Sequence, residues 1–569
     1  MQSHNPSVAI IGAGLGGIAA AIALKKRGYE NFTILEKALD VGGTWRGCTS
    51  DVSIHYYSLS TDLKHDWNYT CEFAYNIHAY AKDLVKKHNL ASQIVFGAEV
   101  ISAMWDTQSQ TYSVTTEDVG SKKRSVLVAN IVISAHGILH VPKYPNIPGL
   151  SEFSGPVMHS AKWDTNLDLR GKKIAVIGNG GSACQLIPYV AKTEGVQLTH
   201  FIRTRNWILP AVSSQPVAML QRKSDKFMVV PIHRYWKWAF KHIPFVTRLY
   251  RWTMFWVFES AYYLIFKIAA SRALLMKGAK KYMNDTAPKK YRGLLEPSFP
   301  LGCRRMIFDA GYLECLNRPN VDLKEGGEIA SVDSNGIIMK NDLLFHRDLT
   351  DKTTGKKLPF DVIACGTGFV TVSIPSVLDK FPYLLRGRNS TMQEFYDKHD
   401  GPLAYLGTAV PGFPNFFMLN EFIVFFFTQH LTSRVGPNTA TGYTSVLFFT
   451  EAQLIHLFQL IQPILDKKVS SFEVTAQANE KYNKALQSKL DSMVFSFCAS
   501  WYRAGSNGRN VSIFPGSALQ FWWWCRKVNW SDYIAVGPDA KKFSNSGMGI
   551  VPLMSAAILS ISMLWWVIA

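Results

Sequence analysis

Two glycine-rich loops, each between a short apolar strand and a helix, constrain the fold of this chain most strongly. The first loop follows a strand that begins at Val8 and has glycine at positions 12, 14 and 17. Gly12 permits a tight turn, Gly14 lets the backbone approach a pyrophosphate, and Gly17 lets the helix pack closely on the strand. The N-terminus of the helix also offers N–H donors to an anion. The pattern predicts a dinucleotide-binding unit.

An acidic residue indicates which nucleotide this unit binds. The second strand, residues 32–35, leads to Glu36, which is placed to accept hydrogen bonds from both ribose hydroxyls. A carboxylate at this position would repel a 2′-phosphate. The unit is therefore predicted to bind FAD or NAD rather than NADP.

A second loop of the same kind follows a strand that begins at residue 172. Alanine stands at its third glycine position, as the motif allows, and its residues are Gly178, Gly180, Gly181, Ser182 and Ala183. After the next strand, Arg203 and Thr204 stand where an NAD site would have an acid. An arginine accommodates a 2′-phosphate, so this unit is predicted to bind NADPH, and the alternative is a solvated arginine without a ligand.

The segment that joins the two units has the pattern F-x-G-x-x-x-H-x-x-x-W over residues 153–163, which include His159 and Trp163. This pattern resembles the fingerprint of Baeyer-Villiger monooxygenases, class B flavoproteins that insert one oxygen atom of O2 beside a ketone carbonyl. The resemblance implies that His159 and Trp163 form a hinge that couples the movements of the two nucleotide-binding domains. Taken alone, a histidine here is more often a hydrogen-bonded packing residue.

Two further segments resemble the flavin side of the same family. Gly43, Thr44 and Trp45 resemble its second flavin-contacting segment. Asp51 and Tyr57 fall on a run in which the aspartate lies beside the isoalloxazine and the nicotinamide. The family usually has a longer loop between the tryptophan and this aspartate. The resemblance implies that all five residues contact a cofactor.

Residues 297–305 match the family's P-x-x-P-x-G-x-[KR]-R segment. Arg305 falls on the arginine with which family members stabilise the peroxyflavin and hold NADP. The resemblance therefore implies a catalytic role for Arg305, oriented by Asp51, and the alternative is a surface charge. Together with segments near 360–369 and 436–516, the resemblance covers the chain from Val8 to Tyr533.

The 569 residues exceed what one hydrophobic core usually supports, so two or more domains are expected. The predicted fold class is α/β, with two Rossmann-like dinucleotide-binding domains, a helical insertion and a C-terminal apolar helix. The FAD-binding domain is predicted over residues 1–165 and 359–540, and the NADPH-binding domain over 166–214 and 293–358. Residues 215–292 are predicted to form a helical lid over the substrate cavity that could also rest on a membrane surface.

Charge and cysteines narrow the range of partners. Lys and Arg number 61 against 42 Asp and Glu, and the net charge of +19 suits nucleic acid, anionic lipid or a phosphorylated cofactor. The sequence contains no recognised nucleic-acid module, so nucleic-acid binding is not expected. The eight cysteines show no C-x-x-C or zinc spacing. They are predicted to be reduced and to form no metal site. The absence of a redox-active cysteine pair also argues against a disulfide reductase.

The last residues of the sequence are predicted to anchor the protein in a membrane. Residues 549–569 carry no charged side chain and follow Lys541 and Lys542. At about 1.5 Å per residue, such a helix spans a hydrocarbon core of about 30 Å. Lysines on its N-terminal side keep the catalytic domain in the cytosol, with the endoplasmic reticulum as a candidate membrane. The alternative is a buried core helix.

Residues 421–435 are extra relative to the family and include an uncharged aromatic run at 422–427. Such a run is an aggregation hazard when it is exposed, and a long loop inside a compact domain is uncommon without a function. Two explanations compete: a hydrophobic element at the membrane or the substrate entrance, and a retained intron, which the in-frame length favours. A peptide with this run in protein from the natural source would rule out the intron.

The resemblance implies an FAD- and NADPH-dependent monooxygenase that converts a ketone to an ester or a lactone. The aromatic helical insertion suits a bulky, apolar substrate, and fungal biosynthetic relatives suggest a polyketide or terpenoid ketone of secondary metabolism. Two alternatives stay open. One is a related enzyme that oxygenates nitrogen or sulfur, and the other is a membrane-tethered flavoprotein without oxygenase activity.

Overall fold

The computed structural model describes residues 5–46, 50, 53–137, 142–210, 231–340, 356–368, 381–419, 437–498, 500, 502–504 and 508–543. Three predictions concern residues outside these ranges: the role of Asp51, the insert at 421–435 and the apolar tail at 549–569. Within the described part of the chain, none of the helices combines the length and the hydrophobicity that crossing a bilayer requires.

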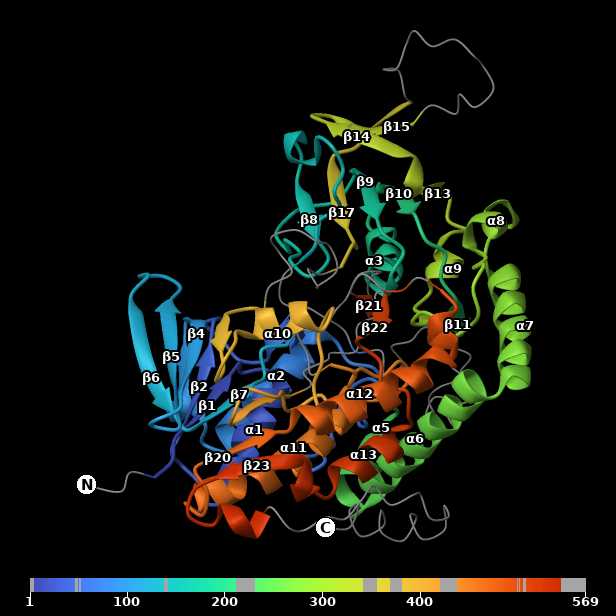
Figure 1. The fold of residues 1–569 in the computed structure, drawn as a ribbon. Coiled ribbons are helices and arrows are strands. Elements are labelled where there is room, and N and C mark those ends of the chain that lie inside the picture. The colour runs from blue at the N-terminus through green and yellow to red at the C-terminus, as the bar shows by residue number, and fades with distance from the viewer. Residues whose placement is uncertain are drawn as a thin grey trace.

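Two parallel sheets of five strands each organise the molecule (Figure 1). The first has the order β19-β7-β1-β2-β3. Its strands are β1 (Val8–Ile11), β2 (Phe32–Glu36), β3 (Ile94–Phe96), β7 (Ile131–Ser134) and β19 (Phe416–Met418). Every residue of β1, β7 and β19 is buried. Such strands are apolar along most of their length because both faces of a parallel sheet are covered.

The second sheet has the order β13-β10-β9-β17-β8. Its strands are β8 (Val157–His159), β9 (Lys173–Ile177), β10 (Gln197–Ile202), β13 (Val321–Glu325) and β17 (Val362–Cys365). The domain boundaries expected at 165 and 359 place β8 and β17 with the first sheet. Backbone pairing places both in the second sheet, because β17 pairs with β8 on one side and with β9 on the other. The chain therefore crosses between the two units before β8 and after β17.

Smaller sheets flank these two. One has the order β18-β4-β5-β6 and another the order β14-β15-β16, and three further sheets are pairs of strands. The bounds are β4 (Ala98–Asp106), β5 (Thr111–Asp118), β6 (Arg124–Ala129), β11 (Ile208–Pro210), β12 (Ile307–Asp309), β14 (Ile329–Asp333), β15 (Gly336–Met339), β16 (Lys357–Pro359), β18 (Leu384–Arg386), β20 (Ser471–Val474), β21 (Arg503–Ala504), β22 (Arg509–Asn510) and β23 (Tyr533–Val536). The strands β6 and β7 follow each other in the chain and belong to different sheets.

Helices α1 and α3 follow the two glycine loops, and α11 packs against α1 and α13. The described helices outside the insertion are α1 (Leu15–Lys25), α2 (Ala74–Lys87), α3 (Gly181–Val190), α9 (Tyr312–Cys315), α10 (Met392–Lys398), α11 (Val446–Leu465), α12 (Ala476–Asp491) and α13 (Ala518–Cys525). The insertion contains α5 (Arg234–His242), α6 (Val246–Tyr262) and α7 (Ala269–Thr286), as its aromatic pattern predicts, and α8 (Arg292–Leu295) begins where it ends. In Figure 1 the green helices α6 and α7 form one outer edge of the molecule.

Candidate active site

The first glycine loop has a backbone that a larger residue would obstruct. Gly12 has φ +105°, and a Cβ atom there would lie 2.4 Å from the carbonyl oxygen of Ala135. A Cβ atom on Gly17 would lie 2.0 Å from the carbonyl oxygen of Gly12. Gly14 is the N-cap of α1 and contributes no side chain that would compete with an anion for the helix N-terminus. The predicted roles of the three glycines agree with this geometry.

Glu36 lies beside the first loop, where its spacing predicts it. Its carboxylate accepts hydrogen bonds from the backbone N–H groups of Ala13, at 2.7 Å, and Ala38, at 2.8 Å. These bonds fix an acceptor and a negative charge at the end of β2. The carboxylate suits a ribose with free hydroxyls and disfavours one that carries a phosphate.

The segment after Glu36 returns to the same loop. The N–H group of Gly42 donates to the carbonyl oxygen of Ala13 at 3.0 Å. Gly43 and Thr44 begin the short 3-10 helix η1 (Gly43–Arg46). Trp45 is buried and packs edge-on against Tyr57, with ring centroids 5.1 Å apart. The structure thus places this segment against the first loop, whereas the predicted contact of Asp51 lies outside the described residues.

The second glycine loop repeats the obstructed turn. Gly178 has φ +118°, and a Cβ atom there would lie 2.3 Å from the carbonyl oxygen of Gly366. His200 is buried, its Nε2 donates to the carbonyl oxygen of Gly178 at 2.6 Å, and its Nδ1 accepts from the hydroxyl of Tyr312 at 3.0 Å. This tautomer follows because a carbonyl oxygen only accepts. Burial lowers the pKa of His200 to about 4, so the ring is neutral at physiological pH.

Helix α3 begins where the second loop ends. Gly180 is its N-cap, without a side-chain hydrogen bond, and Gly181 and Ser182 form the start of its first turn. Ala183 is completely buried, and a Cβ atom added to Gly366 would lie 2.9 Å from its methyl group. The small third residue therefore lets helix and strand approach closely, as the motif predicts.

Arg203 and Thr204 follow β10 and lie beside this loop. The side-chain amide of Asn179 donates to the carbonyl oxygen of Thr204 at 2.8 Å. Burial and, after it, the positive charge of Arg203 lower the pKa of Arg304. Nε and Nη1 of Arg304 are buried and have no hydrogen-bond partner within the described ranges. Two guanidinium groups that repel each other suit a phosphate between them.

Arg304 therefore joins Arg203 as a phosphate-binding candidate that the sequence analysis did not assign. Its guanidinium carbon lies 4.9 Å from the ring centroid of Phe299, which fixes the side chain laterally. The sequence signal for Arg304 was its position in the P-x-x-P-x-G-x-[KR]-R segment, which requires a basic residue directly before Arg305. Its proximity to Arg203 required the fold, because 100 residues separate the two in the sequence.

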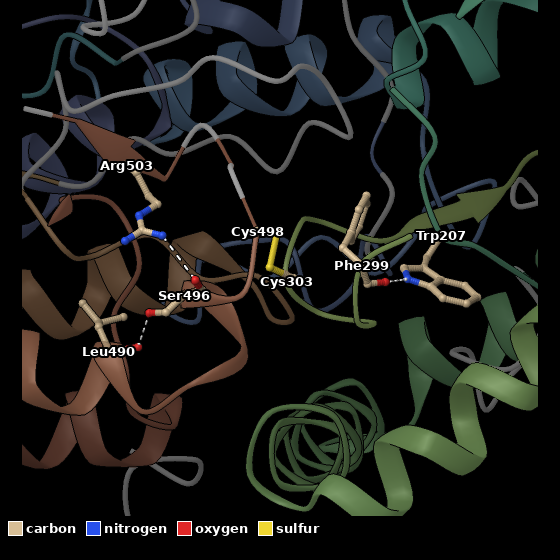
Figure 2. Close-up of a disulfide and its surroundings, with 7 residues drawn as sticks. All are labelled: Trp207, Phe299, Cys303, Leu490, Ser496, Cys498 and Arg503. Atoms are coloured by element: carbon tan, nitrogen blue, oxygen red, sulfur yellow. Dashed lines mark hydrogen bonds between the residues drawn. A yellow bond between two sulfur atoms is a disulfide. The ribbon is translucent and has the colours of Figure 1, made fainter. Parts of the chain in front are cut away.

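A hydrogen bond and a disulfide hold the loop that carries Arg304 and Arg305 (Figure 2). The indole N–H of Trp207 donates to the carbonyl oxygen of Phe299 at 2.8 Å, and Cys303 forms a disulfide with Cys498. The prediction that the cysteines are reduced is therefore wrong for this pair. The two cysteines lie 195 residues apart, so their spacing carried no signal. The other cysteines within the described ranges are buried and form no disulfide there: Cys71, Cys184, Cys315, Cys365 and Cys525.

Arg305 lies at the edge of an aromatic cluster. Its Nη1 donates to the carbonyl oxygen of Thr441 at 3.4 Å. Phe266 stacks on Phe495 at 4.9 Å between ring centroids, and Phe495 meets Tyr502 edge-on at 5.9 Å. Burial raises the pKa of Tyr502 to about 12, and the nearby charge of Arg305 acts in the opposite direction. A cation beside poorly hydrated rings exerts a strong field on any substrate held there.

The predicted hinge lies at the outer edge of the second sheet. His159 is completely buried in β8, and its Nδ1 accepts from the N–H group of Ala161 at 3.1 Å. Burial lowers the pKa of His159 to about 4, so the ring is neutral. Trp163 is half-buried and packs against the main hydrophobic core. The coupling role of the two residues stays a prediction.

These observations test whether two dinucleotides fit. Each glycine loop ends at the N-terminus of a helix whose N-cap is a glycine, an arrangement that suits a pyrophosphate. The first loop is followed by the carboxylate of Glu36, which suits FAD. The second is followed by Arg203 and Arg304, which suit the 2′-phosphate of NADPH. The residues present fit both groups.

Residues 5–234 match the family of flavin-binding monooxygenase-like proteins. A Baeyer-Villiger monooxygenase from Pseudomonas aeruginosa is 31% identical over 528 residues, which cover 90% of this chain and 88% of that protein. The chain belongs to the Baeyer-Villiger monooxygenase family. A second Baeyer-Villiger monooxygenase, from Streptomyces coelicolor, is 29% identical over 541 residues and 93% of each chain. FAD-binding monooxygenase ktnD from Aspergillus niger is 29% identical over 551 residues, or 93% of this chain and 82% of that protein.

Solved structures share the fold of this Baeyer-Villiger monooxygenase. Oxidized steroid monooxygenase bound to NADP has a TM-score of 0.74 at 21% identity, over 94% of this chain and all of that chain. Closed cyclohexanone monooxygenase has a TM-score of 0.74 at 22% identity, with the same coverage. The predicted enzyme class, a flavin-dependent monooxygenase with FAD and NADPH as cofactors, is confirmed.

Proposed function

We propose that this enzyme inserts one oxygen atom of O2 beside the carbonyl group of a bulky, apolar ketone and releases an ester or a lactone. The observation that carries the proposal is the position of Arg305 at the edge of the cluster of Phe266, Phe495 and Tyr502. Aromatic side chains beside a cationic group are typical of sites that bury an apolar ligand and orient it by polar contacts. A polyketide or terpenoid ketone of secondary metabolism is the substrate class that we favour.

The chain's own residues would bind the reactants, orient them and exclude water. When bound, FAD reduced by NADPH activates O2 and provides the transferred oxygen atom. Arg203 and Arg304 would hold the 2′-phosphate of NADPH, and Glu36 would hold the ribose of FAD. Arg305 would stabilise the negative charge that develops when the ketone carbonyl is attacked. In sum, ketone, O2, NADPH and one proton become ester, NADP+ and water.

We also propose that residues 549–569 attach the enzyme to a membrane and leave its catalytic domain in the cytosol. The support is the sequence of this tail, which has no charged side chain and is preceded by Lys541 and Lys542. An apolar ketone would partition into the same membrane, so attachment would place the enzyme where its substrate is concentrated.

Isotope labelling tests the oxygenation. Purified holoenzyme is given NADPH, 18O2 and a series of cyclic ketones of increasing size, and the products are analysed by mass spectrometry. We expect an ester or a lactone with one 18O atom for each NADPH consumed, and faster turnover with the larger ketones.

Sulfides and tertiary amines in parallel reactions test the main alternative. Products labelled only on sulfur or nitrogen, with no ester from any ketone, would assign the enzyme to heteroatom oxygenation. Consumption of NADPH with hydrogen peroxide as the only product would indicate a flavoprotein without oxygenase activity.

A further inference from the structure

Helix α6 has two apolar faces, and one of them packs against the rest of the molecule. Met254, Phe255 and Phe258 on the inner face are buried. Arg251 anchors the same face, because its Nη1 donates to the carbonyl oxygens of His55, at 2.7 Å, and Ser58, at 2.8 Å. The inner face of α6 is therefore packed against the rest of the molecule. The opposite face carries exposed side chains.

The opposite face of α6 and its two ends expose large apolar side chains. Leu249, which is 55% exposed, and Val257 are eight residues apart on α6 and lie on the same side of the helix. Phe245, which is 71% exposed, is the N-cap of α6, and Leu264 lies in the π-helix η5 (Tyr263–Lys267) that follows it. On the preceding helix α5, Trp238 is 57% exposed and Tyr235 is exposed one turn before it. We call these six residues the outer face.

The charge around the outer face has one sign. Residues 231–279 contain eight lysines and arginines, of which Arg251 points to the inner face, and a single acidic residue, Glu259. The next two lysines are paired, Lys280 with Glu296 and Lys281 with Asp285. Glu259 is buried, and its carboxylate accepts hydrogen bonds from the hydroxyl of Tyr443 at 3.1 Å and the N–H group of Ala518 at 2.8 Å. The helices that carry the outer face therefore combine exposed aromatic and aliphatic side chains with positive charge.

Single exposed apolar residues are normal on protein surfaces, but several on consecutive helices indicate an interaction site. A helix that lies on a membrane has apolar aromatic side chains at the headgroup boundary and lysines or arginines that attract anionic lipids. In Figure 1 the N-terminal part of α6 and the red segment that ends the described chain both lie at the lower edge of the molecule. An attachment through the outer face and one through the tail would therefore be compatible.

We propose that the outer face docks on an anionic phospholipid surface. Trp238, Phe245 and Leu249 enter the headgroup boundary, and the surrounding lysines and arginines attract the lipid phosphates. This contact is distinct from the C-terminal tail, and it does not depend on which substrate the enzyme oxidises.

Hydrogen–deuterium exchange of the full-length holoenzyme tests the proposal. The enzyme is mixed with vesicles of phosphatidylcholine alone or of phosphatidylcholine with phosphatidylserine. Because an inserted tail would bring the protein to both kinds of vesicle, only protection within α5 and α6 reports on the outer face. We expect slower exchange of these helices with the anionic vesicles, and a loss of this protection at high salt.

The test variant is the triple substitution Trp238→Ser, Phe245→Ser, Leu249→Ser. Anionic vesicles should slow the exchange of α5 and α6 at least about tenfold less in this variant than in the wild type. The matched control is Val126→Ser, Val128→Ser on β6, where the side chains are 64% and 55% exposed, and it should behave as the wild type. Flavin absorbance confirms that both variants retain bound FAD.

Three results would overturn the proposal. One is unchanged exchange of α5 and α6 on anionic vesicles. Another is equal protection by both kinds of vesicle at any salt concentration, since charge would then have no part. The third is protection that rises with protein concentration in the absence of lipid, which would identify the outer face as a contact between two copies of this chain.

Discussion

At the residue scale, Arg304 and Arg305 are sequence neighbours with different surroundings. Arg304 lies near Arg203 and packs on Phe299, whereas Arg305 reaches the carbonyl oxygen of Thr441 beside the aromatic cluster. We therefore propose that Arg304 binds the nucleotide phosphate and that Arg305 acts on the reacting carbonyl. Substitutions at the two positions should affect different steps.

Arg305→Ala should reduce ester formation about a hundredfold or more, because one positive group that stabilises developing charge is removed. Anaerobic reduction of the bound flavin by NADPH should change little. Stopped-flow absorbance measures reduction, and chromatography measures ester per NADPH. Arg305→Lys, which keeps the charge, should recover part of the yield, and ester formation by Arg305→Ala at the wild-type rate would remove Arg305 from the reaction.

Arg203→Ala and Arg304→Ala should each weaken NADPH binding about tenfold or more and leave NADH binding nearly unchanged, since a hydrogen bond between charged groups contributes about 1.5–3 kcal/mol. Steady-state KM values for both nucleotides measure the effect. Arg318→Ala, at an exposed position hydrogen-bonded to Asn320, is the control. Equal losses for NADPH and NADH would show that the arginines have only a structural role.

Buried histidines make the stability depend on pH. Burial lowers the pKa of His200 and of His456 to about 4, from an ordinary value of 6.5. The contribution of the two neutral histidines to the free energy of unfolding is therefore complete above about pH 6.5. It is lost as the pH falls toward 4, by about 1.4 kcal/mol per pH unit for each histidine. Between about pH 7 and pH 5, the melting temperature of His456→Gln should fall less than that of the wild type. The exposed His242→Gln should match the wild type, and identical slopes for all three proteins would contradict the assignment.

At the element scale, the disulfide joins the arginine loop to the segment after α12. Ser496 is held from both directions, because its carbonyl oxygen accepts from Arg503 at 3.3 Å and its hydroxyl donates to the carbonyl oxygen of Leu490 at 2.8 Å (Figure 2). The hydrogen bonds of Ser496 hold the chain two residues before Cys498, and the disulfide links Cys303 of the arginine loop to this segment. The covalent link should restrict the movement of Arg304 and Arg305.

Cys303→Ser should lower the free energy of unfolding by about 2–4 kcal/mol, because a cross-link over a long loop restricts the unfolded chain. Thermal unfolding with and without a thiol reductant measures the change. The reductant should destabilise the wild type and leave Cys303→Ser unaffected. Thiol titration of the denatured protein adds a direct test: the sequence has eight cysteines, and reduction of the disulfide should raise the number of reactive thiols by two. Eight reactive thiols before reduction would contradict the disulfide.

At the scale of the whole molecule, one continuous hydrophobic core runs through both sheets and the insertion. Ile10 of β1, Val176 of β9 and Met254 of α6 belong to the same buried cluster. The helical insertion is therefore part of the main core, not a detached lid. The outer face and the C-terminal tail are the parts that we expect to contact a membrane.

Deletion of residues 548–569 should convert a protein that sediments with membranes into a soluble one, because the apolar tail is removed and the catalytic core is kept. Ultracentrifugation of cell lysates measures the distribution, and flavin fluorescence of the supernatant measures retained FAD. Solubility of the full-length protein without detergent would contradict the anchor. Retained weak binding to anionic vesicles by the deleted form would be assigned to the outer face.

The sequence by itself determined the two glycine-loop units and predicted the nucleotide that each one prefers. Gly12, Gly17 and Gly178 stand where only a glycine fits, and Glu36 and Arg203 differ in charge at equivalent places. These are local signals, because the turn, the helix N-terminus and the residue after the next strand all lie close together in the chain. They could be identified without knowledge of the fold.

The tertiary structure alone decided the contacts between distant segments. It brought Arg304 to Arg203, paired Cys303 with Cys498, and placed β8 and β17 in the second sheet. Local propensity and motif spacing contain no information about such pairs, which form only when the burial of apolar surface folds the chain into one core. For the same reason, the sequence could predict an aromatic helical insertion, but only the fold showed which side of α6 is buried and which side faces outward.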